Sequence, residues 1–139
     1  MMILDTNVVS EIMRPRPSEE VLDFLDRHPE QSLYLTTITI AEILAGAASH
    51  KDPAQRTDLH NRAKKMLSMF SGRELPFNHH ASMIFSRIMG PAKLRGITIS
   101  FEDCAIAAIA LSRNCPVASR DKRPFHEAGV QIVDPWISD

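Results

Sequence analysis

Cysteine is scarce in this sequence, and long apolar runs are missing. The two cysteines among the 139 residues, Cys104 and Cys115, form no CxxC pair and lie on one expected helix, so no disulfide is expected. Unpaired cysteines suit a reducing compartment. No apolar run approaches the roughly 18 residues of a membrane span, and no charged segment precedes one as in a signal peptide. These absences predict a soluble cytoplasmic protein with no membrane partner.

An excess of either charge is also lacking. The chain has 16 lysines and arginines and 17 aspartates and glutamates, which gives a formal net charge of -1. No global positive field therefore attracts nucleic acid, and any nucleic-acid binding must use a local patch. The sequence contains no glycine-rich dinucleotide motif, no Walker motif and no nucleophile elbow. With no repeat or linker, residues 1–139 are expected to form one domain.

Short apolar runs alternate with helical patterns along the chain, which is typical of an α/β fold with a parallel sheet. Strands are expected at residues 2–4, 33–36, 74–77, 116–119 and 130–133, with a further apolar run at 97–99. Helices are expected at residues 7–13, 18–28, 39–49, 53–70, 78–96 and 100–114. The expected N-caps are Ser18, Thr39, Asp52, Asn78 and Ser100. Gly90 and Pro91 are expected to kink or end the fifth helix, because proline lacks a backbone N–H.

Four carboxylates stand at or just past the ends of apolar runs: Asp5, Glu42, Asp103 and Asp121. Asp5 follows the first expected strand directly, and Asp103 follows the run at 97–99. In an open parallel sheet, ligands bind outside the carboxyl ends of the strands, so the four acids are expected to converge on one cleft. Clustered carboxylates repel one another, and they either take up protons or hold a cation. A metal site is the simplest interpretation.

Each acid also has a simpler interpretation when it is taken singly. Asp5 or Asn7 can cap the helix that follows the first strand. Glu42 with Thr39, and Asp103 with Ser100, match capping boxes at the starts of two helices. The fourth acid can be an ion-pair partner in a charged loop. Helix capping does not explain why all four acids fall at the same edge of the sheet, so the joint pattern favours a metal site.

Five segments carry a resemblance to a known family. They are residues 3–11 (ILDTNVVSE), 39–46 (TIAEILAG), 103–108 (DCAIAA), 117–121 (VASRD) and 133–136 (VDPW). In this order and spacing, which cover essentially the whole chain, they resemble the successive motifs of PIN-domain ribonucleases. The likeness is greatest to the small toxins of VapBC-type toxin–antitoxin modules, in particular the FitB-like branch.

The resemblance implies a three-layer α/β/α domain with a central parallel sheet, acting as a metal-dependent endoribonuclease toxin of a type II toxin–antitoxin system. It places the acidic site on the four carboxylates named above, with Asn7 and Ser119 as polar supports. It also implies a homodimer held in check by a small antitoxin whose C-terminal segment occupies the cleft. Operator DNA would then be bound through the antitoxin.

The residue types fit this chemistry. Oxygen ligands suit Mg²⁺ or Mn²⁺, whereas zinc usually recruits histidine or cysteine. Such a metal positions and deprotonates a water for attack on a phosphodiester, and it neutralises charge that develops on phosphate oxygens. Asp5 is the expected central ligand, with Asp103 and Asp121 completing the metal shell directly or through water. Glu42 is expected to ligate the metal or to orient the attacking water.

Basic residues flank one of the acids. Arg120, Lys122 and Arg123 are candidates to hold RNA phosphates at the rim of the cleft, and a solvated charged loop explains them equally well. Four acids in one cleft also form a strong anionic site. An arginine of the antitoxin is therefore expected to enter it, because a guanidinium binds carboxylates through two parallel hydrogen bonds.

Other function classes stay open on the sequence. A haloacid-dehalogenase-like phosphatase also has an aspartate after its first strand, but its chemistry requires a second acid two residues on, where this chain has Asn7. A receiver-type regulatory module places an acidic pair beside its first strand, whereas this chain disperses its acids to Glu42 and Asp103. A nuclease-inactive binding module of the same fold is also compatible with the sequence.

Overall fold

The computed structural model describes residues 1–137, and these contain one five-stranded sheet. The strands are β1 (Met2–Leu4), β2 (Leu33–Thr36), β3 (Glu74–Leu75), β4 (Val117–Ala118) and β5 (Ile132–Val133). Their order in the sheet is β3-β2-β1-β4-β5, and every neighbouring pair is parallel. The predicted parallel sheet is confirmed, with a strand at each of its five expected places.

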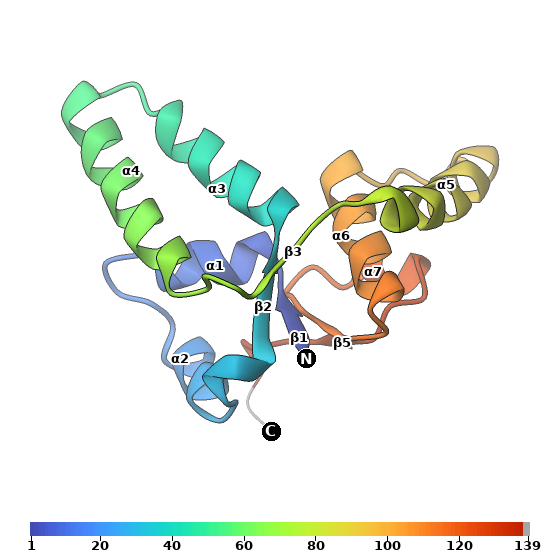
Figure 1. The fold of residues 1–139 in the computed structure, drawn as a ribbon, viewed down its shortest axis with the longest axis horizontal. Helices are drawn as coiled ribbons and strands as arrows, with labels where there is room; N and C mark the ends of the chain where they lie inside the picture. The colour runs from blue at the N-terminus through green and yellow to red at the C-terminus, as the bar shows by residue number, and fades with distance from the viewer. Residues whose placement is uncertain (138–139) are drawn as a thin grey trace.

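Helices connect the strands and form two arms that project from the sheet. The helical segments are α1 (Thr6–Ile12), α2 (Glu19–Asp26), the 3₁₀ helix η1 (Glu30–Ser32), α3 (Thr37–Ala48), α4 (Pro53–Ser68), α5 (His79–Leu94), α6 (Phe101–Ser112) and α7 (Arg123–Glu127). One arm consists of α3 and α4, and the other contains α5 and α6 (Figure 1). Within the part of the chain that the structure describes, no helix has the length and apolar character to cross a membrane.

Strand β1 lies at the centre of the sheet, and the chain leaves it in two directions. It passes first to β2 and β3 on one side and later returns to β4 and β5 on the other. The change of direction lies between β1 and β4, where Leu4 pairs with Ala118. In open α/β sheets, the crevice at such a point is the usual ligand site. Asp5 and Ser119, which follow these two strands, both stand there.

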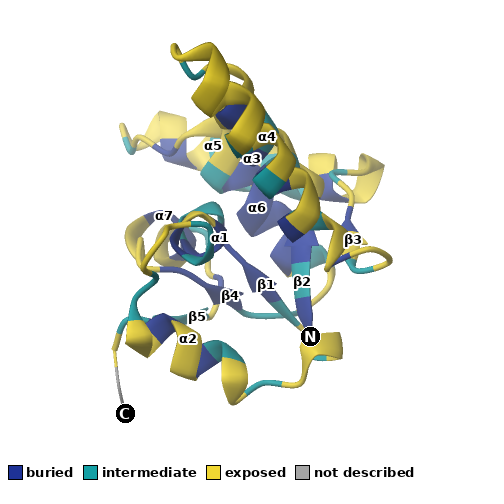
Figure 2. Ribbon diagram, turned by 90° about the vertical axis from the view of Figure 1, so that its left-hand side faces the viewer, coloured by how far each residue is buried: buried dark blue, intermediate teal, exposed yellow. Residues whose placement is uncertain are grey.

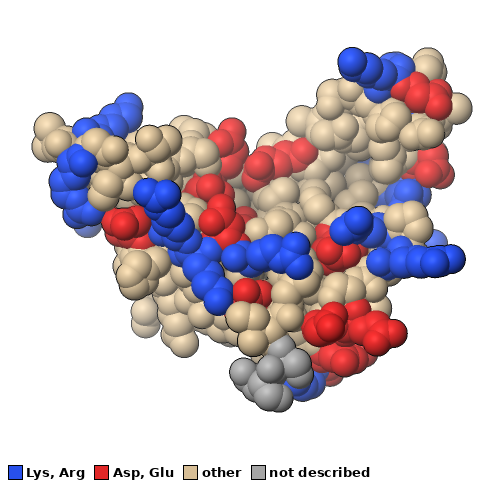
Figure 3. Space-filling model, turned by 180° about the vertical axis from the view of Figure 1, so that it is seen from behind, with Lys and Arg blue, Asp and Glu red and all other residues tan. Residues whose placement is uncertain are grey.

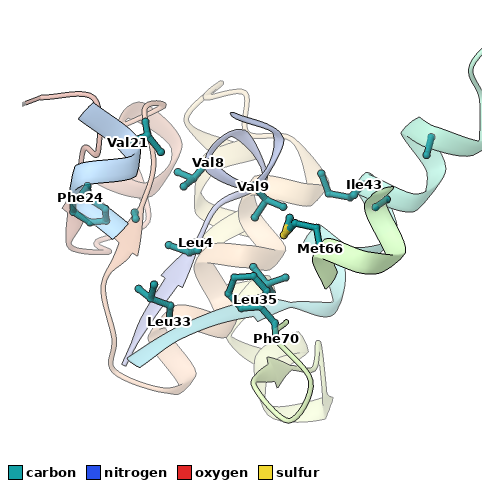
Figure 4. Close-up of a cluster of buried hydrophobic side chains, with 13 residues drawn as sticks. Leu4, Val8, Val9, Val21, Phe24, Leu33, Leu35, Ile43, Met66 and Phe70 are labelled. Atoms are coloured by element: carbon teal, nitrogen blue, oxygen red, sulfur yellow. The ribbon is translucent and has the colours of Figure 1, made fainter. Parts of the chain in front are cut away.

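Side chains of β1 alternate between the two faces of the sheet and so enter two different cores. Leu4 belongs to a core that α1, α2, α3 and α4 cover (Figure 4). Ile3 belongs to the opposite core, which α5, α6 and α7 cover. The first core is built mainly from Leu4, Val8, Val9, Val21, Phe24, Leu33, Leu35, Ile43, Met66 and Phe70. Helices therefore cover both faces, which confirms the predicted three-layer α/β/α architecture.

Helix α6 is the most deeply enclosed helix of the second core. Residues 104–110 are all buried, as is typical of a helix that is apolar on every side. Figure 2 shows the contrast with α4 and α5, whose outer surfaces are exposed. Cys104 on α6 and Cys115 beyond it are both unpaired, as predicted. The burial of α6 fixes the position of its first turn, which carries Asp103.

Four predicted N-caps are confirmed, and one is wrong. Helices α2, α4, α5 and α6 are capped by Ser18, Asp52, Asn78 and Ser100. Helix α3 is capped by Thr36, whose Oγ1 accepts the backbone N–H of Thr39 at 3.1 Å. Because Thr36 is both the last residue of β2 and the cap, α3 begins before the predicted position. The capping box of Thr39 and Glu42 is therefore not formed.

The prediction that Gly90 and Pro91 could end α5 is also wrong, whereas the predicted end of the helix near Gly96 is confirmed. The helix continues through Gly90 and Pro91 to Leu94. Pro91 stands close to the helix end, and its carbonyl accepts the N–H of Arg95 at 3.0 Å, which keeps the last turn closed. Gly96 follows with a positive φ of 70°, a conformation that favours glycine just beyond a helix.

Residues 97–99 form no strand, although their apolar pattern suggested one. Ile97 and Ile99 instead pack with Ala92 of α5 and Cys104 of α6. Their side chains are apolar because they close a small satellite core and not because they join the sheet. Two short helical segments, η1 and α7, were not expected from the sequence.

Ile106→Ala should destabilise the protein by about 3 kcal/mol, because Ile106 is fully buried on α6 and its loss leaves a cavity. Leu94→Ala is the matched control, since Leu94 is 91% exposed and should change stability by less than about 0.5 kcal/mol. Urea unfolding of both variants measures the difference. Equal losses would contradict the placement of α6 at the centre of the second core.

Candidate functional site

Asp5 is a carboxylate that is almost completely enclosed, with 4% of its surface exposed. It is the N-cap of α1, and its Oδ1 accepts the backbone N–H of Thr6 at 2.8 Å. Its Oδ2 accepts the hydroxyl of Ser119 at 2.7 Å and the side-chain amide of Asn7 at 3.3 Å. Three donors from α1 and from the loop after β4 therefore fix this carboxylate in one orientation.

Ser119 connects the ends of β1 and β4. Its Oγ donates to Asp5 and accepts from the Asn7 amide at 3.1 Å and from the backbone N–H of Asp121 at 3.0 Å. A hydroxyl has one proton to donate and two lone pairs to accept with, so the hydrogen-bonding capacity of this fully buried side chain is satisfied. The two predicted polar supports, Asn7 and Ser119, both lie against Asp5.

Glu42 lies on α3 and ends a chain of threonine hydroxyls. Thr6 Oγ1 donates to Glu42 Oε1 at 2.7 Å, and Thr36 Oγ1 donates to Thr39 Oγ1 at 3.4 Å. Thr6 and Thr39 are joined by a hydrogen bond of 3.0 Å. Because the proton of Thr6 is already used on Glu42, Thr39 is the donor of this bond. The hydroxyls therefore all point towards the Glu42 carboxylate.

The threonine chain was not expected as part of the site. Thr6 belongs to the first motif, but its hydroxyl finds its acceptor, Glu42, only because α3 packs close to it. Thr36 and Thr39 are both fully buried, and buried threonines at a strand end were the one signal available in the sequence. Their connection to Glu42, which runs through Thr6, follows from tertiary contacts alone.

All four predicted acids line one cavity of about 570 Å³ at the carboxyl edge of the sheet, which we call the acid cavity. Asp103 comes from the first turn of α6 and not from the end of a strand, so that part of the prediction is wrong. Figure 3 shows acidic side chains gathered at the notch between the two arms. The full lining is Asp5, Thr6, Asn7, Ser10, Glu11, Arg14, Glu42, Asp103, Arg120, Asp121 and Trp136.

Burial and mutual repulsion make Asp5, Glu42 and Asp103 hard to ionise. Burial raises the pKa of Asp5 to about 6, although hydrogen bonds from Ser119 and Thr6 oppose the change, and the charges of Asp103 and Glu42 raise it further. Burial also raises the pKa of Glu42, and so do the charges of Glu102 and Asp103. The pKa of Asp103 is raised by burial and by the neighbouring acids. A cation would relieve this repulsion.

The oxygen groups that line the acid cavity are suitable ligands for a hydrated hard cation. The lining contains carboxylate, hydroxyl and amide groups and no histidine or cysteine, which disfavours zinc. Among residues 1–137, no three His, Cys, Asp or Glu side chains are grouped closely enough to hold one ion directly. Mg²⁺ usually keeps several waters and binds only one or two carboxylates, so this spacing fits Mg²⁺ or the similar Mn²⁺.

The three basic candidates do not share one location. Arg120 lines the acid cavity. Lys122 forms an ion pair with Asp134 at 3.5 Å and lies away from that lining, and Arg123 begins α7. Of the three candidates, Arg120 alone therefore lies beside the four acids.

Comparison with known proteins agrees with this geometry. Residues 2–131 match the family model of the PIN domain. This chain belongs to the PIN-domain family. It is 39% identical to the VapC ribonuclease Y4jK of Sinorhizobium fredii over 98% of both chains. It is also 39% identical to the toxin FitB of Neisseria gonorrhoeae, over 98% of this chain and 99% of FitB.

Solved structures extend the likeness to three dimensions. A structure of FitAB bound to a DNA fragment contains a chain with a TM-score of 0.90 and 38% identity, covering 100% of this PIN domain protein and 98% of that chain. The predicted resemblance to VapC-type toxins is thereby confirmed. Membership of the PIN-domain family excludes the receiver and haloacid-dehalogenase alternatives, which belong to other families.

In the metal-free protein, the stability of Asp5→Asn relative to the wild type should be about 2 kcal/mol greater at pH 7.5 than at pH 4, because ionising a buried carboxyl with a pKa of about 6 opposes folding. A raised native pKa favours folding below the unfolded value of 3.8, and this advantage is lost as the pH rises through 6. The gain of the variant over the wild type should therefore shrink between pH 7.5 and pH 4.

Urea unfolding in EDTA across this pH range measures the effect. Asp52→Asn is the matched control, since Asp52 is also an N-cap but is exposed and lies outside the acid cavity. A gain that is the same at pH 4 and pH 7.5 would contradict the raised pKa of Asp5.

Proposed function

We propose that this PIN-domain protein is a metal-dependent endoribonuclease and the toxin of a type II toxin–antitoxin system. The observation that carries the proposal is the convergence of four acids on one cavity around the buried Asp5 carboxylate. Relatives of nearly the same length that bear the names VapC ribonuclease and toxin FitB support the choice of RNA as the substrate. We propose the cytoplasm as its location, since the RNA substrate of such a toxin is found there.

The acids have different roles in this proposal. Asp5, with Asp103 and Asp121 directly or through water, holds a Mg²⁺ or Mn²⁺ ion. When bound, the ion lowers the pKa of a water and offsets the charge that develops on the phosphate oxygens. Ser119 and Asn7 hold Asp5 Oδ2, and the Thr6 backbone N–H holds Oδ1, so little reorganisation is needed when substrate binds.

Glu42 is proposed to orient the attacking water and to accept its proton. Its pKa is raised by burial and by neighbouring charge, which brings this carboxylate closer to the working pH of a general base. The threonine chain fixes its Oε1, and this is the only Glu42 oxygen with a hydrogen-bond donor among the described residues. The other oxygen is then the one that faces the water.

A small antitoxin is proposed to inhibit the enzyme by placing an arginine among the four acids. A guanidinium binds carboxylates through charge-assisted pairs of hydrogen bonds and competes with the metal for the same charge. An apolar groove of about 450 Å³ joins the acid cavity at Thr6 and Glu42 and is lined by Met13, Ile43 and Leu59, among others. It would hold an apolar segment of the same antitoxin. The solved FitAB complex on DNA supports a comparable partner and operator binding through it.

A homodimer is also proposed. Phe101, at the start of α6, is 53% exposed, and its ring packs edge-on or tilted against those of Phe77 and Phe85. Met83 on α5 is exposed on the same arm. An exposed aromatic cluster of this kind is a suitable contact for a second copy of the chain.

Asp5→Asn should fold and lose metal-dependent RNA cleavage by about a thousandfold, because the change removes the charge of the central ligand. Cleavage of a single-stranded RNA with Mg²⁺ or Mn²⁺ measures it, and Asp52→Asn should keep full activity. Undiminished cleavage by Asp5→Asn would refute the site. If the wild type binds RNA and cleaves nothing with either metal, the nuclease-inactive binding module is correct instead.

Mn²⁺ should raise the melting temperature of the wild type by several degrees, since a ligand of the native state alone stabilises it and also relieves carboxylate repulsion. The Asp5→Asn variant should show a much smaller rise. Differential scanning fluorimetry with millimolar Mn²⁺ compares the two proteins. An equal rise in both would mean that the ion binds elsewhere.

A further inference from the structure

The rim of the acid cavity carries a stacked pair of side chains. The guanidinium carbon of Arg120 lies 4.1 Å from the centre of the Trp136 ring. Both residues line the acid cavity. We propose that Arg120 binds a backbone phosphate of single-stranded RNA at this rim, and that Trp136 is the positioning residue that holds its guanidinium there. This inference rests on the proposed function and deepens it.

Arg120 is an arginine beside four carboxylates that pairs with none of them. Among residues 1–137 its guanidinium forms no ion pair, whereas the other arginine of the lining, Arg14, lies 3.4 Å from Glu11. A guanidinium that turned inward would compete with the metal for the acids. Stacking on an aromatic ring holds the cation at the rim without using its N–H donors, which stay available for phosphate oxygens.

Trp136 is itself firmly held. Its ring is half-buried and packs against the first core, and its backbone N–H donates to Asp134 Oδ1 at 2.9 Å. Asp134 in turn pairs with Lys122, which removes that lysine from the acid cavity. The C-terminal segment therefore presents one cation to the cavity, in a fixed place.

The backbone of Arg120 is held in place as well as its guanidinium. Its backbone N–H donates to Asn7 Oδ1 at 3.4 Å, and Asn7 also contacts Asp5. The phosphate-binding guanidinium is thus connected to the central acid through a single side chain. This connection sets the register between the bound phosphate and the phosphodiester that is cleaved.

The first test measures RNA binding in an Asp5→Asn background, which keeps the RNA uncleaved. Arg120→Gln should weaken binding of a single-stranded RNA oligonucleotide by about 10- to 100-fold. It should also reduce the slope of log affinity against log salt concentration by about 0.7, the value for one phosphate contact on a single strand. Arg113→Gln, at an exposed position beyond α6, is the control and should change neither quantity.

Trp136→Leu should lower the salt slope by the same amount as Arg120→Gln, although Arg120 is still present. Trp136→Phe should largely restore the wild-type slope. The double variant of Arg120→Gln and Trp136→Leu should be no weaker than either single variant. If Trp136→Leu lowers only the melting temperature, the ring has a structural role and the inference is wrong. If the two losses add, Trp136 contacts RNA by itself, which also overturns it.

A second readout needs no change at Trp136. It is the only tryptophan of the chain, so its fluorescence reports on the Arg120 stack directly. Saturating RNA should change this emission in the Asp5→Asn protein and much less in its Arg120→Gln derivative. Unchanged emission at saturation would overturn the inference.

Different results would refute the nuclease activity and the role of the Arg120–Trp136 pair. Wild-type protein that cleaves no RNA with Mg²⁺ or Mn²⁺ refutes the nuclease. Wild-type protein that cleaves RNA, with KM and salt dependence unchanged in Arg120→Gln and Trp136→Leu, refutes only the role of the stacked pair.

Discussion

The burial of one carboxylate, Asp5, is the constraint on which the rest of the site depends. An ionised carboxyl with 4% of its surface exposed is stable only if donors and a counter-charge replace the lost water. The fold supplies the donors from the ends of the two central strands, through Thr6 and Ser119. Among residues 1–137 it supplies no cation that pairs with Asp5, and it adds further acids instead. The site is therefore built to attract a positive charge from outside.

Several features follow from the need of Asp5 for a counter-charge. The same anionic cavity suits a divalent metal, and it equally suits an arginine from an inhibitor, so in the proposed function activation and inhibition use one electrostatic feature. Arg14 of the lining is paired with Glu11. Arg120, by contrast, would neutralise the acids if it turned inward, and its stack on Trp136 holds it at the rim. Positive charge at the rim with negative charge at the centre is an arrangement that suits a phosphate backbone above a metal site.

Much of the fold could be predicted because its signals are local. Five short apolar runs fixed the strands, and the acid that follows the first of them marked the carboxyl edge of the sheet. The failures arise where a local pattern has two meanings. Residues 97–99 are apolar because they pack beside Cys104, and Thr36, as the last residue of a strand, displaced Thr39 as the cap of α3. The threonine chain to Glu42 joins residues 36 apart, which no local pattern contains.

The central claim is that the Asp5 carboxylate holds a divalent cation, and crystals soaked in MnCl₂ test it most directly. Anomalous scattering from manganese locates the ion without any assumption about activity. A peak at about 2.1 Å from an Asp5 oxygen, with Asp103 or Asp121 next to it or linked through water, is the predicted result. Absence of a peak from the acid cavity, at a Mn²⁺ concentration that supports cleavage, would contradict the claim.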